Sequence, residues 1–133
     1  MPTLTINGTT IEVPAGTNLI EAARLAGAAV PHFCYHPDLA IAGNCRMCLV
    51  HIEKFPKLQI ACNTVAADGM VVTTNDDETT DAVQGVLEFL LKNHPVDCPI
   101  CDQAGECKLQ DYTWSMASTS RASTRPTRCT SGK

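Results

Sequence analysis

The sequence predicts an α+β fold in which short strands and two main helices carry two irregular loops that contain most of the cysteines. Three observations support this prediction: alternating apolar residues about an Asn-Gly turn, a later apolar stripe with helical spacing, and turn-rich stretches around the cysteines. The chain has 133 residues, of which 44% are hydrophobic and 18% charged. That composition allows one average domain, or a small domain with an appendage.

The first thirty residues predict a hairpin followed by a helix. Apolar residues alternate on both sides of the Asn7-Gly8 dipeptide, which is a strong hairpin signal. Asn18 can cap a helix, and Glu21, three residues later, can complete a capping box. Gly27 can end this helix. Further short strands are expected at 49–52, 59–61 and 71–73, with a turn-rich segment between residues 31 and 48.

A second helix is predicted, with the acidic residues Asp76-Asp77-Glu78 at its start and apolar periodicity from Asp81 onward. Its apolar residues recur at i, i+3, i+4, i+7 and i+8, at Val83, Val86, Leu87, Leu90 and Leu91. Pro95 disfavours helical angles at the residue before it, so the helix should end by His94. The small N-terminal domain is expected to cover this apolar stripe only in part. Residues 94–107 are expected to form a loop, and residues 109–114 are expected to begin a last short helix.

Charge is distributed unevenly along the chain. Residues 1–114 contain all 14 acidic residues and six basic ones, whereas residues 115–133 contain four basic residues and no acid. The overall net charge of −4 argues against nucleic-acid binding. No apolar stretch is long enough to span a bilayer, and no basic segment followed by an apolar core opens the chain, so a cytosolic protein is expected. The segment 115–133, poor in large apolar residues, is predicted to be disordered.

Eight cysteines in such a chain indicate metal binding or redox chemistry rather than disulfides. The first set has the spacing C-x10-C-x2-C-x13-C and comprises Cys34, Cys45, Cys48 and Cys62. Two thiolates separated by two residues can hold one metal centre, and four thiolates suit either zinc or a [2Fe–2S] cluster. Zinc sites usually contain two such pairs, so the single pair here favours iron and sulfur. Buried cysteines without a metal are the remaining alternative.

The second set has the spacing H-x3-C-x2-C-x5-C and comprises His94, Cys98, Cys101 and Cys107. Replacing one thiolate by histidine removes a negative charge, which should raise the reduction potential of an iron–sulfur cluster. A zinc ion held by three cysteines and one histidine is a rival on chemistry alone. His94 can also be read as an ordinary residue at a helix C-terminus.

The remaining histidines and Cys129 are expected to have ordinary roles. His32 and His36 flank Cys34 and should pack or face solvent, His51 should lie on the solvated face of a strand, and Cys129 falls in the predicted tail. The sequence contains no nucleotide-binding glycine motif and no paired-carboxylate or nucleophile pattern. It therefore predicts no catalytic residue and no self-contained active site.

Three stretches together resemble the N-terminal part of the G subunit of bacterial NADH:quinone oxidoreductase, respiratory complex I. They are Phe33-Cys34-Tyr35-His36-Pro37 with Ala42-Gly43-Asn44-Cys45-Arg46-Met47-Cys48, Ala61-Cys62-Asn63-Thr64, and the run from His94 through Cys107 to Tyr112. The resemblance covers residues 1 to about 114. It implies a β-grasp, ferredoxin-like domain over 1–77 and a small helical segment over 78–114, followed by the tail, 115–133.

The same resemblance implies the cofactors and their ligands. A [2Fe–2S] cluster would be held by Cys34, Cys45, Cys48 and Cys62, and a [4Fe–4S] cluster by His94, Cys98, Cys101 and Cys107. The work implied is one-electron transfer from NADH, through a flavin-bearing subunit, toward quinone. The implied partners are other peripheral-arm subunits, especially the flavin-bearing one, without direct membrane insertion. The implied location is cytoplasmic, peripheral to the inner face of the cell membrane.

Two alternatives to this function stay open. The related electron-transfer portion of an NAD-linked hydrogenase or formate dehydrogenase carries similar modules, and a zinc-stabilised interaction domain belongs to a different class. Members of the resembled family are also several times longer. Under a GC-rich codon choice, skipping two nucleotides near Trp114 restores an acidic continuation like theirs, so we expect residues 115–133 to be a frameshift product. A short protein with a basic interaction tail is the alternative.

Overall fold

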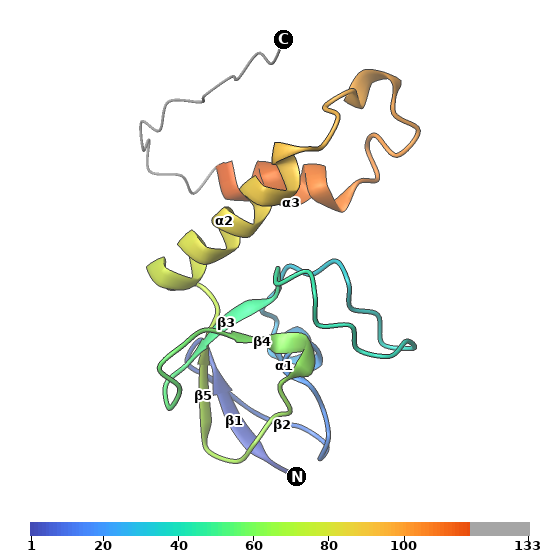
Figure 1. The fold of residues 1–133 in the computed structure, drawn as a ribbon. Coiled ribbons are helices and arrows are strands. Elements are labelled where there is room, and N and C mark those ends of the chain that lie inside the picture. The colour runs from blue at the N-terminus through green and yellow to red at the C-terminus, as the bar shows by residue number, and fades with distance from the viewer. Residues whose placement is uncertain (118–133) are drawn as a thin grey trace. The chain divides into compact units, whose positions relative to one another are not determined.

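The computed structural model describes residues 1–117, which divide into two compact units after Asp97 (Figure 1). The first unit contains a sheet, two helices and a short 3-10 turn, and the second contains a 3-10 turn and a helix. The predicted boundary between residues 77 and 78 falls at the start of the helix Asp77–Lys92, which contacts the sheet and lies in the first unit.

The sheet has five strands in the order β2-β1-β5-β3-β4 and is mixed. β1 lies antiparallel to β2 and parallel to β5, and β3 lies antiparallel to both β5 and β4. The strands are β1 (Thr3–Ile6), β2 (Thr9–Glu12), β3 (Leu49–Ile52), β4 (Gln59–Ile60) and β5 (Met70–Thr73). The predicted strands are confirmed, except that Ala61 begins the 3-10 turn η1 (Ala61–Asn63) instead of extending β4.

The predicted hairpin is confirmed. Leu4 pairs with Ile11 and Ile6 with Thr9, and the turn residues Asn7 and Gly8 have φ angles of 48° and 84°. Two consecutive positive φ angles give a turn whose twist matches that of the flanking strands, which is why Asn-Gly is favoured there. The hairpin therefore follows from local chemistry alone.

Helix α1 (Leu19–Leu25) covers the sheet and contributes to the core. Its inward-facing residues Leu19, Ile20, Ala22 and Ala23 are all buried. They join the buried sheet residues Leu4, Ile6, Val50, Ile52 and Val72 in one cluster. Gly27, with a φ of 77°, follows the end of the helix as predicted.

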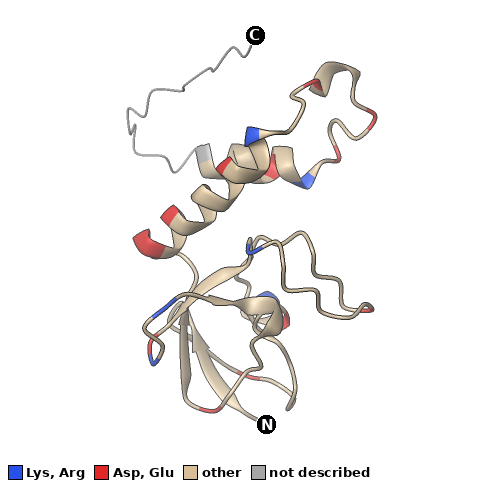
Figure 2. Ribbon diagram, in the orientation of Figure 1, with Lys and Arg blue, Asp and Glu red and all other residues tan. Residues whose placement is uncertain are grey.

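Helix α2 (Asp77–Lys92) begins at the predicted acidic run, with Asp76 in the N-cap position and Asp77 and Glu78 in the first turn. Figure 2 shows acidic residues at the start of α2 and a basic one at its end, an arrangement favourable to the helix dipole. Within the predicted stripe, Val83 and Leu87 are buried, whereas Leu90 is 40% exposed. The expectation that the apolar stripe is only partly covered is confirmed for the first unit.

The second unit contains η2 (Cys98–Ile100) and α3 (Lys108–Ala117). Helix α3 runs three residues beyond Trp114, so residues 115–117, which the sequence assigns to the tail, are helical. The Thr113 hydroxyl donates to the Leu109 carbonyl at 2.7 Å, and the Ser115 hydroxyl donates to the Tyr112 carbonyl at 3.0 Å. These bonds to preceding carbonyls satisfy the two hydroxyl groups within the helix. The rest of the predicted tail, with Cys129, lies outside the described residues.

Candidate metal centres

The first cysteine set lies where the loop of residues 31–48 meets one end of the β3–β4 pair. The loop contains no helix or strand, and it turns at Gly43 and Arg46, whose φ angles are 62° and 59°. Cys48 immediately precedes β3, and Cys62 lies in η1 just after β4. The backbone N–H of Ala61 donates to the carbonyl of Cys48 at 2.8 Å, which continues the strand pairing and brings Cys62 close to Cys48.

The four thiols of this set interact with one another. Cys48 and Cys62 are buried, whereas Cys34 and Cys45 are half-buried. Burial raises the pKa of the Cys62 thiol to about 12. A hydrogen bond to Cys48 and the negative charges of Cys48, Cys34 and Cys45 act in the same direction on that pKa. The structure therefore brings together all four residues of the first predicted set.

The loop backbone supplies donors to the sulfur atoms at its two ends. The pKa of Cys34 is lowered chiefly by the backbone N–H of Cys45, with further donors at Asn44 and Gly43, although burial acts in the opposite direction. Cys45 also receives a hydrogen bond from the backbone N–H of Met47 at 3.5 Å. Such N–H groups stabilise negative sulfur and are one means by which a protein tunes an iron–sulfur cluster.

The chemistry of these donors fits an iron–sulfur cluster. Four thiolates in one place repel each other, so they require either protons or a positively charged centre to offset them. A [2Fe–2S] cluster takes four thiolates, which is the number of cysteines in this set.

The second set is divided between the two units. Cys98, Cys101 and Cys107 lie in one short segment of the second unit, whereas His94 follows α2 in the first. Within the segment, Cys101 N–H donates to Cys98 O at 3.2 Å and Ala104 N–H to Cys101 O at 3.1 Å. The N–H of Gly105 (φ 87°) donates to the side chain of Gln110 at 3.0 Å. These consecutive tight turns keep the three cysteines near the start of α3.

The other histidines have structural contacts. The ring of His32 meets Tyr35 edge to face, with centroids 5.6 Å apart, and His36 is exposed. His51 is half-buried on β3, where its Nδ1 lies 3.7 Å from an Asp76 carboxylate oxygen. The sequence analysis missed the hydrogen-bonding role of Tyr35. A tyrosine directly after a candidate ligand is the signal that could have drawn attention to it.

Comparisons with known proteins place the chain in a family. Residues 1–77 match the model of the 2Fe-2S iron-sulfur cluster binding domain, and residues 84–120 match that of the NADH-ubiquinone oxidoreductase-G iron-sulfur binding region. The chain belongs to the 2Fe-2S iron-sulfur cluster binding domain family and contains, after that domain, a 4Fe-4S-binding region of the type found in NADH-ubiquinone oxidoreductase. The two predicted cofactors, one [2Fe–2S] and one [4Fe–4S] cluster, are thereby confirmed.

Curated relatives agree with the predicted resemblance. The G subunit of the NADH-quinone oxidoreductase of Rickettsia bellii is 56% identical over 111 residues, or 84% of this chain. The NADH-ubiquinone oxidoreductase 78 kDa subunit of Neurospora crassa is 56% identical over 110 residues, and that of Candida albicans 52%. The chain spans only 15–16% of the length of these relatives.

A solved structure extends the similarity to another kind of enzyme. A chain of an NAD+-reducing [NiFe]-hydrogenase in the H2-reduced state matches with a TM-score of 0.79 and 30% sequence identity. The match covers 90% of this chain and 50% of that one. Within residues 1–117, no helix is both long enough and apolar enough to cross a membrane.

Replacement of Gly43 by alanine should weaken the first site. At the Gly43 φ of 62°, an L-residue costs about 1–2 kcal/mol, and the added Cβ would lie 3.3 Å from Ile60 Cδ1. We expect lower [2Fe–2S] occupancy, measured by iron analysis and EPR. Gly16→Ala is the matched control, because Gly16 has a φ of 89°, open space around it and no neighbouring cysteine. Equal cluster loss in both variants would show that the effect is not local to the loop.

Proposed function

We propose that the two predicted ligand sets hold the two clusters. Cys34, Cys45, Cys48 and Cys62 bind the [2Fe–2S] cluster, and His94, Cys98, Cys101 and Cys107 bind the [4Fe–4S] cluster. The observation that carries the proposal is the gathering of four thiols from a loop, the start of β3 and η1 within the residues that match the 2Fe-2S domain. For the second set, support comes from the spacing and from the match over residues 84–120.

The chain's function under this proposal is one-electron transfer. Each cluster supplies a reversible one-electron redox centre when it is bound, and the protein determines its ligands, burial and hydrogen bonding. Burial of Cys48 and Cys62 excludes water from one side of the first site, and the N–H donors around Cys34 and Cys45 stabilise the charge there. No acid–base residue is required, because electron transfer breaks no covalent bond in a substrate.

We assign this electron transfer to an NADH:quinone oxidoreductase. The supporting observation is the identity of 52–56% to curated G and 78 kDa subunits. The donor would be NADH acting through a flavin-bearing subunit, and the acceptor side would lead to quinone. The site of action would be cytoplasmic, at the inner face of the cell membrane. The mixed sheet crossed by α1 supports assignment of the domain to the β-grasp, ferredoxin-like fold.

A second candidate rests on the hydrogenase match. A TM-score of 0.79 at 30% identity shows that a similar arrangement occurs in an NAD+-reducing hydrogenase. The higher identity to the oxidoreductase subunits favours the first assignment. Co-purification of the tagged chain from its native host separates them, since flavin- and quinone-linked subunits are expected for the first candidate and a nickel–iron subunit for the second.

Iron and acid-labile sulfide analysis, with low-temperature EPR of the reduced protein, tests the proposal on anaerobically expressed protein. We expect about six irons per chain and two distinct reduced-cluster signals, one from each cluster type. About two irons with a [2Fe–2S] signal alone would remove the second ligand set from the proposal. Zinc without iron would overturn the electron-transfer function and leave the interaction-domain alternative.

A further inference from the structure

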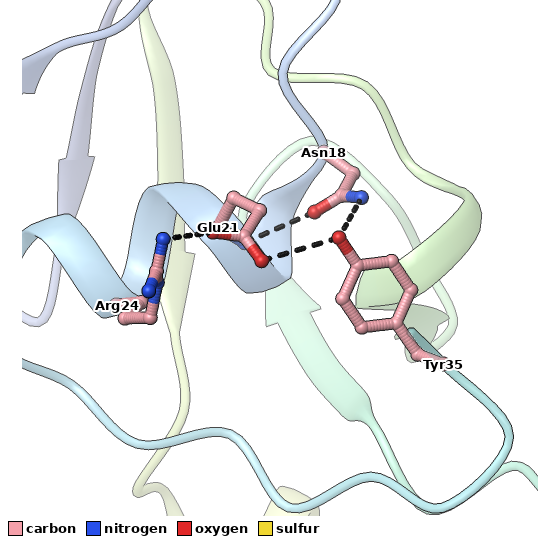
Figure 3. A network of polar contacts seen from close by, with 4 residues as sticks. All are labelled: Asn18, Glu21, Arg24 and Tyr35. Atoms are coloured by element: carbon pink, nitrogen blue, oxygen red, sulfur yellow. Dashed lines mark hydrogen bonds and ion pairs between the residues drawn. The ribbon is translucent and has the colours of Figure 1, made fainter. Parts of the chain in front are cut away.

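A small polar network connects the loop that carries Cys34 to the start of α1 (Figure 3). The Tyr35 hydroxyl accepts a hydrogen bond from Asn18 Nδ2 at 3.1 Å and donates one to Glu21 Oε1 at 3.2 Å. The second carboxylate oxygen of Glu21 pairs with Arg24 at 2.7 Å. The Tyr35 hydroxyl is thus both an acceptor and a donor, and both of its partners lie at the N-terminus of α1.

The two partners of Tyr35 lie at the N-cap and in the first turn of α1. Asn18 is the N-cap, and its side-chain oxygen accepts from the backbone N–H of Glu21 at 3.0 Å. The predicted cap is confirmed, but the Glu21 carboxylate binds Tyr35 and Arg24, whereas the predicted capping box has it return to the N-cap backbone. The carboxylate is therefore used to bind the loop.

The start of α1 is a firm anchor, and it also reaches the segment that carries Cys62. Leu19 and Ile20 are buried. The N–H of Leu19 donates to Thr64 O at 3.0 Å, and the N–H of Ala66 donates to Thr17 O at 2.8 Å. Helix α1 also packs against η1, which contains Cys62. One rigid element therefore contacts the segments that follow two different cysteines of the first site.

The loop needs such an anchor, because residues 31–48 contain no helix or strand that would fix Cys34 in place. The Tyr35 ring packs against the hydrophobic core and meets His32 edge to face. Packing fixes the position of the ring, and the two hydrogen bonds fix its hydroxyl end. Because Tyr35 follows Cys34 directly, restraining its side chain restrains the backbone that carries the Cys34 sulfur.

We propose that Tyr35 is a positioning residue for the [2Fe–2S] cluster: bound by Asn18 and Glu21, it holds Cys34 in place before the cluster arrives. This inference rests on the proposed assignment of Cys34 as a ligand. Ligands that are already held in position lose less conformational freedom on binding, so the cluster is retained more firmly.

Alkylation of the cluster-free full chain, followed residue by residue with mass spectrometry, tests the positioning directly. Tyr35→Phe keeps the ring but removes both hydrogen bonds, so we expect Cys34 to be alkylated roughly 5- to 10-fold faster. Asn18→Ser keeps a good helix cap but removes the donor to Tyr35, and should show a smaller increase at the same cysteine. Cys48, Cys62 and Cys101 serve as internal references, whose rates should not change.

Arg24→Gln is the matched control within the network. It removes an ion pair whose arginine side chain is 76% exposed and leaves the Tyr35 hydrogen bonds intact, so the rate at Cys34 should stay close to that of the wild type. An unchanged Cys34 rate in Tyr35→Phe would overturn the proposal. A parallel increase at all the cysteines would also overturn it, because Tyr35 would then stabilise only the fold.

The loaded protein provides the second readout. We expect Tyr35→Phe to alter the EPR line shape of the reduced [2Fe–2S] cluster and to release its iron to a chelator several-fold faster, with the [4Fe–4S] signal unchanged. An identical line shape and release rate would count against positioning. Cys34→Ser separates this from the ligand assignment: if it keeps the full wild-type [2Fe–2S] signal, the proposed ligand set fails even where the alkylation result holds.

Discussion

Replacing Cys45 by alanine is expected to abolish the [2Fe–2S] EPR signal and to reduce the iron content from about six to about four per chain. Cys45 lies in the loop, half-buried, and is one of the three thiols whose charges act on Cys62. Its removal leaves three thiolates for a cluster that takes four protein ligands. Because Cys45 lies outside the buried core cluster, the sheet should remain folded, with an unchanged far-UV circular dichroism spectrum.

The reciprocal variant and a cysteine control make this prediction specific. Cys101→Ala should remove the [4Fe–4S] signal and preserve the [2Fe–2S] signal, since Cys101 belongs to the other set and to the other compact unit. Cys129→Ala, outside both sets, should retain both signals and all the iron. If Cys45→Ala kept a full [2Fe–2S] signal, Cys45 would not be a ligand. If it lost both signals, the two sites could not be treated as independent.

Replacing His94 by cysteine is expected to lower the midpoint potential of the [4Fe–4S] cluster by on the order of 100 mV. A neutral imidazole is exchanged for a negative thiolate, which favours the oxidised cluster because the added charge disfavours an additional electron. His94 immediately follows the C-cap of α2 and donates its backbone N–H to Leu91 O at 3.2 Å. The substitution therefore changes the ligand without requiring a new backbone conformation.

Redox titration monitored by EPR measures this shift, because the two cluster types give separable signals. His36→Gln, at an exposed histidine beside the first site, is the control and should leave the [4Fe–4S] potential unchanged. His94→Gln should lose the cluster or bind it poorly, because a neutral amide is a weak ligand for iron. A His94→Cys protein with the wild-type potential would contradict ligation by His94. That residue would then be an ordinary residue at the C-terminus of a helix.

Local signals allowed much of the first unit to be predicted. The Asn7-Gly8 turn, the Asn18 cap and Gly27 after α1 all lie where the sequence placed them, because each depends on the φ preference or hydrogen bonding of one or two residues. The start of α2 also lies at the predicted acidic run, Asp76 to Glu78, although apolar periodicity begins only at Val83. Acidic residues in the first turn are favoured by the helix dipole, whereas the Asp76 side chain makes no capping hydrogen bond.

By itself the sequence determined the candidate ligands, their spacing, and the turns and helix caps around them. Only the tertiary structure decided which of these groups meet. Cys62 joins the loop thiols because β3 pairs with β4 and Ala61 N–H bonds Cys48 O, and Glu21 binds Tyr35 because α1 packs beside the loop. Spacing and periodicity are properties of neighbouring residues, whereas strand pairing and helix packing depend on burial across the whole domain.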